Sequence, residues 1–133
     1  MKLSEIEGIG NQYAAKLAKA GVRSTEALLK KGATPEGRKE LAANSGISPT
    51  LILEWVNLAD LFRIKGVGSE YSDLLEEAGV DTVVELAKRV SDNLYAKMVE
   101  VNTAKNLVNK MPSSSQVKGW IEQAKKLPRV ISY

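Results

Sequence analysis

A glycine turn that occurs twice in the sequence has the residue types to bind a phosphate. Its two copies read Gly8-Ile9-Gly10 and Gly66-Val67-Gly68, 58 positions apart. A helical pattern follows each copy, and the first N–H groups of a helix have no partner inside the helix and carry a partial positive charge. Glycine lets an anion approach such N–H groups closely. A phosphate bound in this way would be held without regard to base sequence, and salt would weaken the binding.

The two copies differ in the charge of the residues around them. The first is followed by the neutral donors Asn11 and Gln12 and by the cations Lys16 and Lys19, although Glu5 and Glu7 precede it. The second is followed by the acids Glu70, Asp73, Glu76 and Glu77. A carboxylate in the first turn of a helix favours the same N–H groups that a phosphate needs. The candidate nucleic-acid-binding residues are therefore Gly8, Ile9, Gly10, Asn11, Gln12, Lys16 and Lys19, whereas Gly66, Val67 and Gly68 are expected to be structural.

Both turns also have a purely structural interpretation. Two glycines around one apolar residue join two helices at a fixed angle, whether or not a ligand is bound. In that case an acidic or basic face of the protein would bind a protein partner. The sequence is compatible with two functions. The first is sequence-independent binding of nucleic acid through the DNA backbone, and the second is a protein-interaction or scaffold module with structural turns.

The composition excludes most enzyme chemistry. The chain has no Cys and no His, which removes disulfides, cysteine nucleophiles, histidine acid–base groups and every metal site that needs a thiolate or an imidazole. The acids of residues 70–77 are spread along one helix without loop ligands, as is typical of a solvated face. We expect a protein without enzymatic activity, cofactor or metal.

Length and composition are those of one globular domain. The chain has 133 residues, of which 44% are hydrophobic, 26% charged and 5% aromatic. Because aromatic residues are scarce, the core must be built from Leu, Ile, Val and Ala, which favours packed helices over sheets. No apolar run is typical of a signal peptide or long enough to span a membrane. We expect a cytoplasmic protein that does not bind membranes.

The charges are unevenly distributed although the net charge is only +3. The net charge is +2 for residues 1–63, −5 for residues 64–86 and +6 for residues 87–133. The late basic residues are Lys97, Lys105, Lys110, Lys118, Lys125, Lys126 and Arg129. They come from several expected helices, so they form either one patch or separate surface charges, and the sequence leaves both open.

Apolar spacing and capping residues predict an all-α chain. The strongest helical pattern covers residues 49–62, and Thr34-Pro35 and Ser48-Pro49 are typical helix starts. Further helices are expected near residues 11–20, 69–78, 82–90, 92–101 and 103–110, with Asp81 or Thr82, Ser91 and Thr103 as N-caps. A last helix is expected to be capped by Ser113 or Ser114 and to be ended by Pro128. No stretch alternates as a strand would.

The repeat extends well beyond the glycine turns. Leu17, Ala20, Gly21, Val22 and Leu28 recur as Leu75, Ala78, Gly79, Val80 and Leu86. We therefore expect a single domain over residues 1–133 made of two repeats, 1–63 and 64–133, neither of which folds alone. Trp55 and Trp120 lie at equivalent places and are expected in the core, while Tyr13 and Tyr71 are expected to pack on the partner repeat. The second repeat is about seven residues longer, between Ser91 and Pro112.

The residues around each turn resemble the helix-hairpin-helix motif. The first copy fits with Leu3, Ile6, Gly8, Ile9, Gly10, Ala14 and Leu17, and the second with Leu61, Ile64, Gly66, Val67, Gly68, Ser72 and Leu75. Ser72 stands where the motif prefers Ala. The resemblance implies that the turn presents backbone N–H groups to a DNA phosphate, although many such units serve only for packing or for protein binding.

A more specific resemblance covers nearly the whole chain. It rests on residues 47–49, 53–57, 59–61, 66–71, 78–82, 97–98, 100–102 and 124–129, which include Ile47-Ser48-Pro49 and Ala124-Lys125-Lys126-Leu127-Pro128-Arg129. In these segments the chain is similar to the bacterial domain of unknown function 4332 family. The similarity implies a tandem helix-hairpin-helix fold, a SAM-like helical bundle. It implies no catalytic or binding residues.

Overall fold

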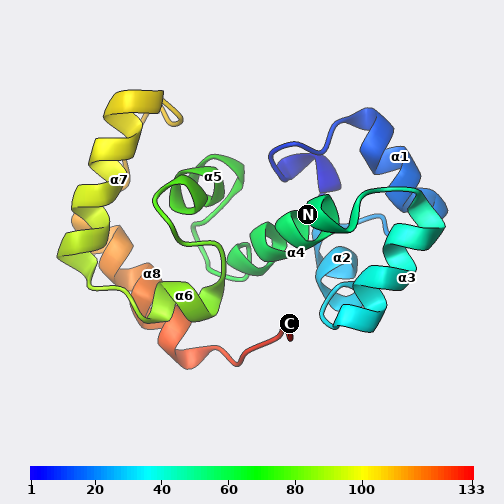
Figure 1. The fold of residues 1–133 in the computed structure, drawn as a ribbon. Coiled ribbons are helices and arrows are strands. Elements are labelled where there is room, and N and C mark those ends of the chain that lie inside the picture. The colour runs from blue at the N-terminus through cyan, green and yellow to red at the C-terminus, as the bar shows by residue number, and fades with distance from the viewer. The chain divides into compact units, whose positions relative to one another are not determined.

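The computed structural model describes residues 1–133 as an all-α chain without strands (Figure 1). Its elements are the 3-10 turn η1 (Leu3–Glu5) and the α-helices α1 (Asn11–Lys19), α2 (Thr25–Lys31), α3 (Pro35–Ser45), α4 (Pro49–Leu61), α5 (Ser69–Glu77), α6 (Val83–Ala87), α7 (Ser91–Lys105) and α8 (Ser114–Lys126). The predicted all-α class and the absence of strands are confirmed. No helix combines the length and the hydropathy that crossing a membrane requires.

The chain divides into two compact units. The first comprises Met1–Asp60 together with Val130–Tyr133, and the second comprises Leu61–Arg129. Helices α1 to α4 occur in the first unit and α5 to α8 in the second, with α4 ending at the boundary. The order of helices therefore repeats along the chain. That residues 1–133 act as a single domain stays a prediction.

The first unit has a core of aliphatic side chains around one tryptophan. Helix α1 packs on α3 and on η1, and α2 also packs on α3. Leu17, Leu28, Leu41, Ile52 and Trp55 are all buried. The C-terminal segment adds to this unit, because Ile131 is buried and the Ser132 N–H donates to the Ala33 carbonyl at 2.8 Å. The tail therefore packs on the first unit.

The second unit is built around α8. This helix packs against both α6 and α7, while α5 packs against α7 (Figure 1). Leu75, Leu86, Met98, Trp120 and Ile121 are buried in its core. A capping box at Ser113 and Gln116 fixes the start of α8, because each residue's side chain pairs with the other's backbone.

The first α-helix of each unit, α1 or α5, ends with the same backbone geometry. Gly21 and Gly79 follow the helix with φ of 88° and 95°. The N–H of Val22 donates to the Leu17 carbonyl at 2.9 Å, and that of Val80 donates to the Leu75 carbonyl at 2.8 Å. This is a Schellman motif, in which glycine adopts the left-handed conformation that other residues avoid. Gly21 and Gly79 therefore end their helices.

Two of the predicted helix boundaries are wrong in the longest helix, α7. Residues 92–101 and 103–110 were expected to form two helices, but α7 runs without a break from Ser91 to Lys105. Thr103 is not an N-cap, because its hydroxyl donates back to the Val99 carbonyl at 2.8 Å inside the helix. Ser91 is the first helical residue rather than the cap, which is Val90. The helix ends at Asn106, whose φ of 50° is left-handed.

The amide of Asn102 explains why residues after α7 are not helical. Its Nδ2 donates to the Val108 carbonyl at 3.1 Å, and its Oδ1 accepts from the Val108 N–H at 2.9 Å. These two bonds hold Val108, which is buried, beside the end of α7. They replace the backbone bonds that a helix over residues 103–110 would have made.

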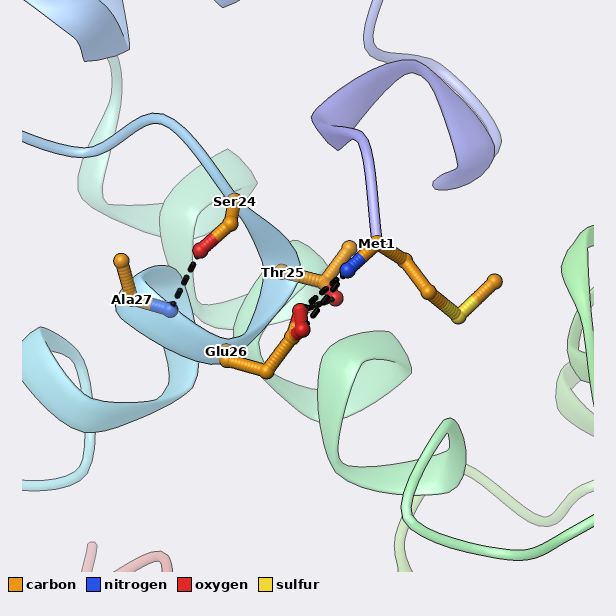
Figure 2. Close-up of polar contacts among 5 residues, drawn as sticks. All are labelled: Met1, Ser24, Thr25, Glu26 and Ala27. Atoms are coloured by element: carbon orange, nitrogen blue, oxygen red, sulfur yellow. Dashed lines mark hydrogen bonds and ion pairs between the residues drawn. The ribbon is translucent and has the colours of Figure 1, made fainter.

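The amino terminus is fastened to α2 (Figure 2). The Met1 ammonium group donates to both oxygens of Glu26, with a distance of 2.6 Å to Oε2. Ser24 caps α2 by accepting from the Ala27 N–H at 3.1 Å. Hydrogen bonds from the Met1 ammonium and from the Thr25 hydroxyl lower the pKa of the Glu26 carboxyl from 4.5 to about 2.

We expect the Glu26 ion pair to stabilise the protein in a pH-dependent way. A carboxyl whose pKa falls on folding contributes stability above its unfolded pKa of 4.5 and loses the contribution as the pH falls towards 2. Because the side chain is 67% exposed, the contribution should be only about 0.5 kcal/mol. In a chain with a free Met1 amine, Glu26→Gln should lower the free energy of unfolding at pH 6 and leave it unchanged near pH 2. Glu40→Gln, an exposed acid of α3, is the control and should lower the stability at neither pH. An equal loss at both pH values would contradict this assignment.

Candidate nucleic-acid interface

The two glycine turns have the same backbone conformation. Gly8 and Gly66 have φ of 95° and 94°. The next N–H, that of Ile9 or Val67, donates to the carbonyl of Ile6 or Ile64 at 3.1 Å in both turns. Ile9 and Val67 are both buried, so each apolar residue anchors its turn in the core. The sequence repeat is therefore also a repeat of local structure.

The helices that follow the turns begin without a side-chain cap. Gly10 is the N-cap of α1 and Gly68 that of α5, and neither N-cap accepts a hydrogen bond through a side chain. Four other helices, α2, α3, α6 and α8, are capped by a Ser or Thr hydroxyl. The first N–H groups of α1 and α5 thus remain available to an external acceptor.

The first turn brings together most of the residues that the sequence singled out. Asn11, Gln12, Lys16 and Lys19 are all exposed on α1. The Lys16 Nζ lies 5.7 Å from the centre of the Tyr13 ring, so this lysine leans back towards the start of the helix. Lys19 lies near the other end of α1. Ile9 can contribute only its backbone, because its side chain is buried.

The second turn is held by a side chain that sequence reasoning missed. The Gln123 amide accepts from the Lys65 N–H at 2.9 Å and donates to the Lys65 carbonyl at 3.2 Å. Leu58 occupies the equivalent place in the first unit, where no such clamp is possible. The signal was the difference between leucine and glutamine at one position of the repeat. Only the structure shows that this position faces the turn.

Residue exchanges across the repeat remove positive charge from the helix that follows the second turn. In the repeat alignment Gln12 corresponds to Glu70, Lys16 to Leu74 and Lys19 to Glu77. Leu74 is fully buried, and Glu77 accepts from the Lys105 ammonium at 2.6 Å. The helix that follows the turn is therefore basic in the first unit and acidic in the second. The residues before the turn have the opposite charges, with Glu5 and Glu7 in the first unit and Arg63 and Lys65 in the second.

Each turn lies beside an aromatic pair of its own unit. Tyr13 meets Trp55 edge-on with ring centres 5.0 Å apart, and Tyr71 meets Trp120 with ring centres 5.4 Å apart. The expectation that the tryptophans are core residues is confirmed, since they are 2% and 3% exposed. The expectation that the tyrosines pack on the partner repeat stays a prediction. Within its own unit each tyrosine packs on an indole, edge-on for Tyr13 and tilted for Tyr71.

The acidic residues of α5 include a close group. Carboxylate oxygens of Asp73, Glu76 and Glu77 lie within 4.8 Å of one another. Lys105 pairs with Glu77 and offsets part of this charge. Exposed carboxylates of this kind are common without a metal.

Three of the late lysines are paired with acids of the same unit. Lys97 lies 3.6 Å from Glu100, Lys105 lies 2.6 Å from Glu77, and Lys125 lies 3.4 Å from Glu122. Lys16 and Lys19 have no ion-pair partner. Local acids therefore offset part of the late positive charge, while Lys110, Lys118 and Lys126 have no ion-pair partner, like the lysines of α1.

Fold and site together define a class of all-α proteins with two four-helix units, each of which carries a glycine turn at an uncapped helix start. A family model described as "Domain of unknown function (DUF4332)" matches residues 7–127. The chain belongs to this family. No curated protein and no solved structure matches the chain.

Proposed function

We propose that this protein is a cytoplasmic, non-enzymatic helix-hairpin-helix module that binds nucleic acid through the phosphate backbone. The binding residues are Gly8, Ile9, Gly10, Asn11 and Gln12, which contribute mainly backbone N–H groups, with Lys16 and Lys19 as cations. The preferred ligand is DNA of any sequence, because N–H groups and lysines on phosphates read no base edges.

The uncapped start of α1 is the observation that carries this proposal. Its N–H groups need acceptors, and no side chain of the protein supplies one. The helix dipole places a partial positive charge at the same point, which favours an anion. Lys16 leans towards this end of the helix and has no acid partner. A phosphate oxygen would meet both kinds of donor at once.

We expect Lys16→Glu to weaken DNA binding about tenfold, equivalent to ~1.4 kcal/mol. The reason is that the substitution replaces an attraction to phosphate by a repulsion at the start of α1. Fluorescence anisotropy with a labelled generic duplex and a labelled single strand measures the affinity, at several salt concentrations. The affinity of the unmodified protein should fall steeply with salt, because each neutralised phosphate releases counterions.

Lys118→Glu is the matched control for this substitution. Lys118 is an exposed lysine of α8 in the second unit, and the variant has the same net charge as Lys16→Glu. The control should bind DNA within about twofold of the unmodified protein if the first turn is the site. An equal loss in both variants would reject the first turn as the site. No binding by the unmodified protein at low salt would reject nucleic-acid binding altogether.

A protein-interaction or scaffold module is the second candidate function, and the acidic face of α5 favours it. Glu70 lies at the exposed start of this helix, and Asp73, Glu76 and Glu77 follow on it. The clamp of Gln123 on Lys65 gives the second turn a structural role of its own. A basic protein partner would fit this face by charge. The anisotropy titration separates the two functions, since a scaffold with structural turns leaves DNA unbound.

A further inference from the structure

Each tryptophan of the chain carries an indole N–H that donates no hydrogen bond within the protein. Indole N–H groups of buried tryptophans usually have a partner. The side chain of Trp55 is 98% buried, as its exposed fraction is 2%. No side-chain nitrogen or oxygen of the protein is both fully enclosed and unpartnered. The Trp55 Nε1 therefore keeps an opening to solvent through which an acceptor can reach it.

The indole nitrogen lies beside the glycine turn. A Cβ atom added to Gly8 would lie 3.4 Å from the Trp55 Nε1. The indole thus occupies the side of the turn that a side chain at position 8 would cover. Because the N–H is a donor only, it favours an acceptor such as a phosphate oxygen and does not favour a cation. Packing against Tyr13 uses the ring and leaves the N–H unused.

We propose that the Trp55 indole N–H donates a hydrogen bond to the phosphate group bound at the first glycine turn. This inference rests on the proposed nucleic-acid binding and adds to it a donor from α4, a helix outside the hairpin itself. The phosphate is then held from two sides, by the N–H groups at the start of α1 and by the indole. Lys16 supplies the counter-charge.

The second unit has the same donor but does not bind phosphate. A Cβ added to Gly66 would lie 3.1 Å from the Trp120 Nε1, so the local geometry is repeated. Glu70 is exposed in the first turn of α5, and no cation replaces Lys16 there, because Leu74 is buried at that position. The acids of α5 repel a negative ligand at the start of that helix, and the backbone of Lys65, the cation before this turn, is held by Gln123. Trp120 is therefore a control for Trp55 within the same molecule.

Nuclear magnetic resonance of the full-length, 15N-labelled protein tests the inference directly. The chain has two tryptophans, and the variant Trp120→Phe assigns the remaining indole resonance to Trp55. On addition of a short generic duplex, the Trp55 indole proton should move downfield and exchange more slowly with solvent. The backbone amides of Asn11 and Gln12 should shift in the same titration, and the Trp120 indole should not respond.

Matched substitutions add a measurement of affinity. Trp55→Phe should weaken duplex binding about tenfold, whereas Trp120→Phe should leave it unchanged, with circular dichroism confirming that both variants are folded. If Trp55→Phe does not fold, the resonance test on the unmodified protein decides alone. Shifts of the Asn11 and Gln12 amides without a response of the Trp55 indole would overturn the inference and leave the proposed function intact. Equal responses of both indoles would also overturn it. If the duplex does not bind at all, both proposals fall.

Discussion

Gly37→Ala should lower the free energy of unfolding by about 2–4 kcal/mol, through overpacking and the loss of a helix cap. A Cβ at this position would lie 2.0 Å from the Lys31 carbonyl oxygen and 3.2 Å from the Thr34 hydroxyl oxygen. The Lys31 oxygen belongs to the backbone and cannot rotate away. The start of α3 must therefore shift, which breaks the hydrogen bond from the Gly37 N–H to Thr34 at 3.1 Å. Urea denaturation followed by circular dichroism measures the change.

Gly119→Ala is the matched control for this substitution. Gly119 is an exposed glycine inside α8, and a Cβ there would meet nothing within 4 Å. Because alanine has the higher helix propensity, this variant should be more stable than the unmodified protein by about 0.5–1 kcal/mol. Opposite signs for the two glycines are the expected result. A Gly37→Ala variant as stable as the unmodified protein would contradict the packing of α2 on α3.

Arg38→Met should have the second largest effect and lower the free energy of unfolding by about 2–4 kcal/mol, because two bonds from a charged donor are lost. The guanidinium of Arg38 is buried and donates to the Gly32 carbonyl and to the Ser132 carbonyl, both at 2.8 Å. It also lies 5.7 Å from the centre of the Tyr133 ring. Methionine keeps the apolar stem but leaves both carbonyls without this donor. Thermal unfolding gives the loss, and amide hydrogen exchange at Ser132 shows whether the tail is released.

Tyr133→Phe separates the contribution of the tail from that of the buried charge. The substitution removes the bond from the Tyr133 hydroxyl to the Asn57 Oδ1, which is 2.9 Å long. It should cost about 1 kcal/mol and leave the two Arg38 bonds in place. Release of the Ser132 amide in Tyr133→Phe but not in Arg38→Met would show that Arg38 does not hold the tail.

Much of the fold was predictable because the determining contacts are local. The Thr34 hydroxyl caps α3 three residues on, and Pro35 fits the first helical position. Gly21 and Gly46 end their helices with positive φ. Such signals act within one helical turn, so the residue types report them directly. The repeat of the glycine turns was visible for the same reason, since Gly8 and Gly66 need the same backbone angle.

The predictions failed where a polar side chain near a helix end bonds to one of several partners within reach. Thr103 is a typical cap residue, yet its hydroxyl bonds inside α7, and Asn102 instead holds Val108. The break expected near residue 102 therefore lies at Asn106. Both outcomes depend on how the end of α7 packs, because a polar side chain near a helix end has more than one partner within reach.

The sequence by itself determined the repeat, the all-α class and the difference in charge between the two glycine turns. These properties follow from residue types at short spacing, where each residue acts on its neighbours. The tertiary structure decided which distant side chains meet the turns. It places the Trp55 indole N–H beside Gly8 and the Gln123 amide on Lys65. The physical reason is that such contacts join residues far apart in the chain, and only the packing of one helix against another brings them together.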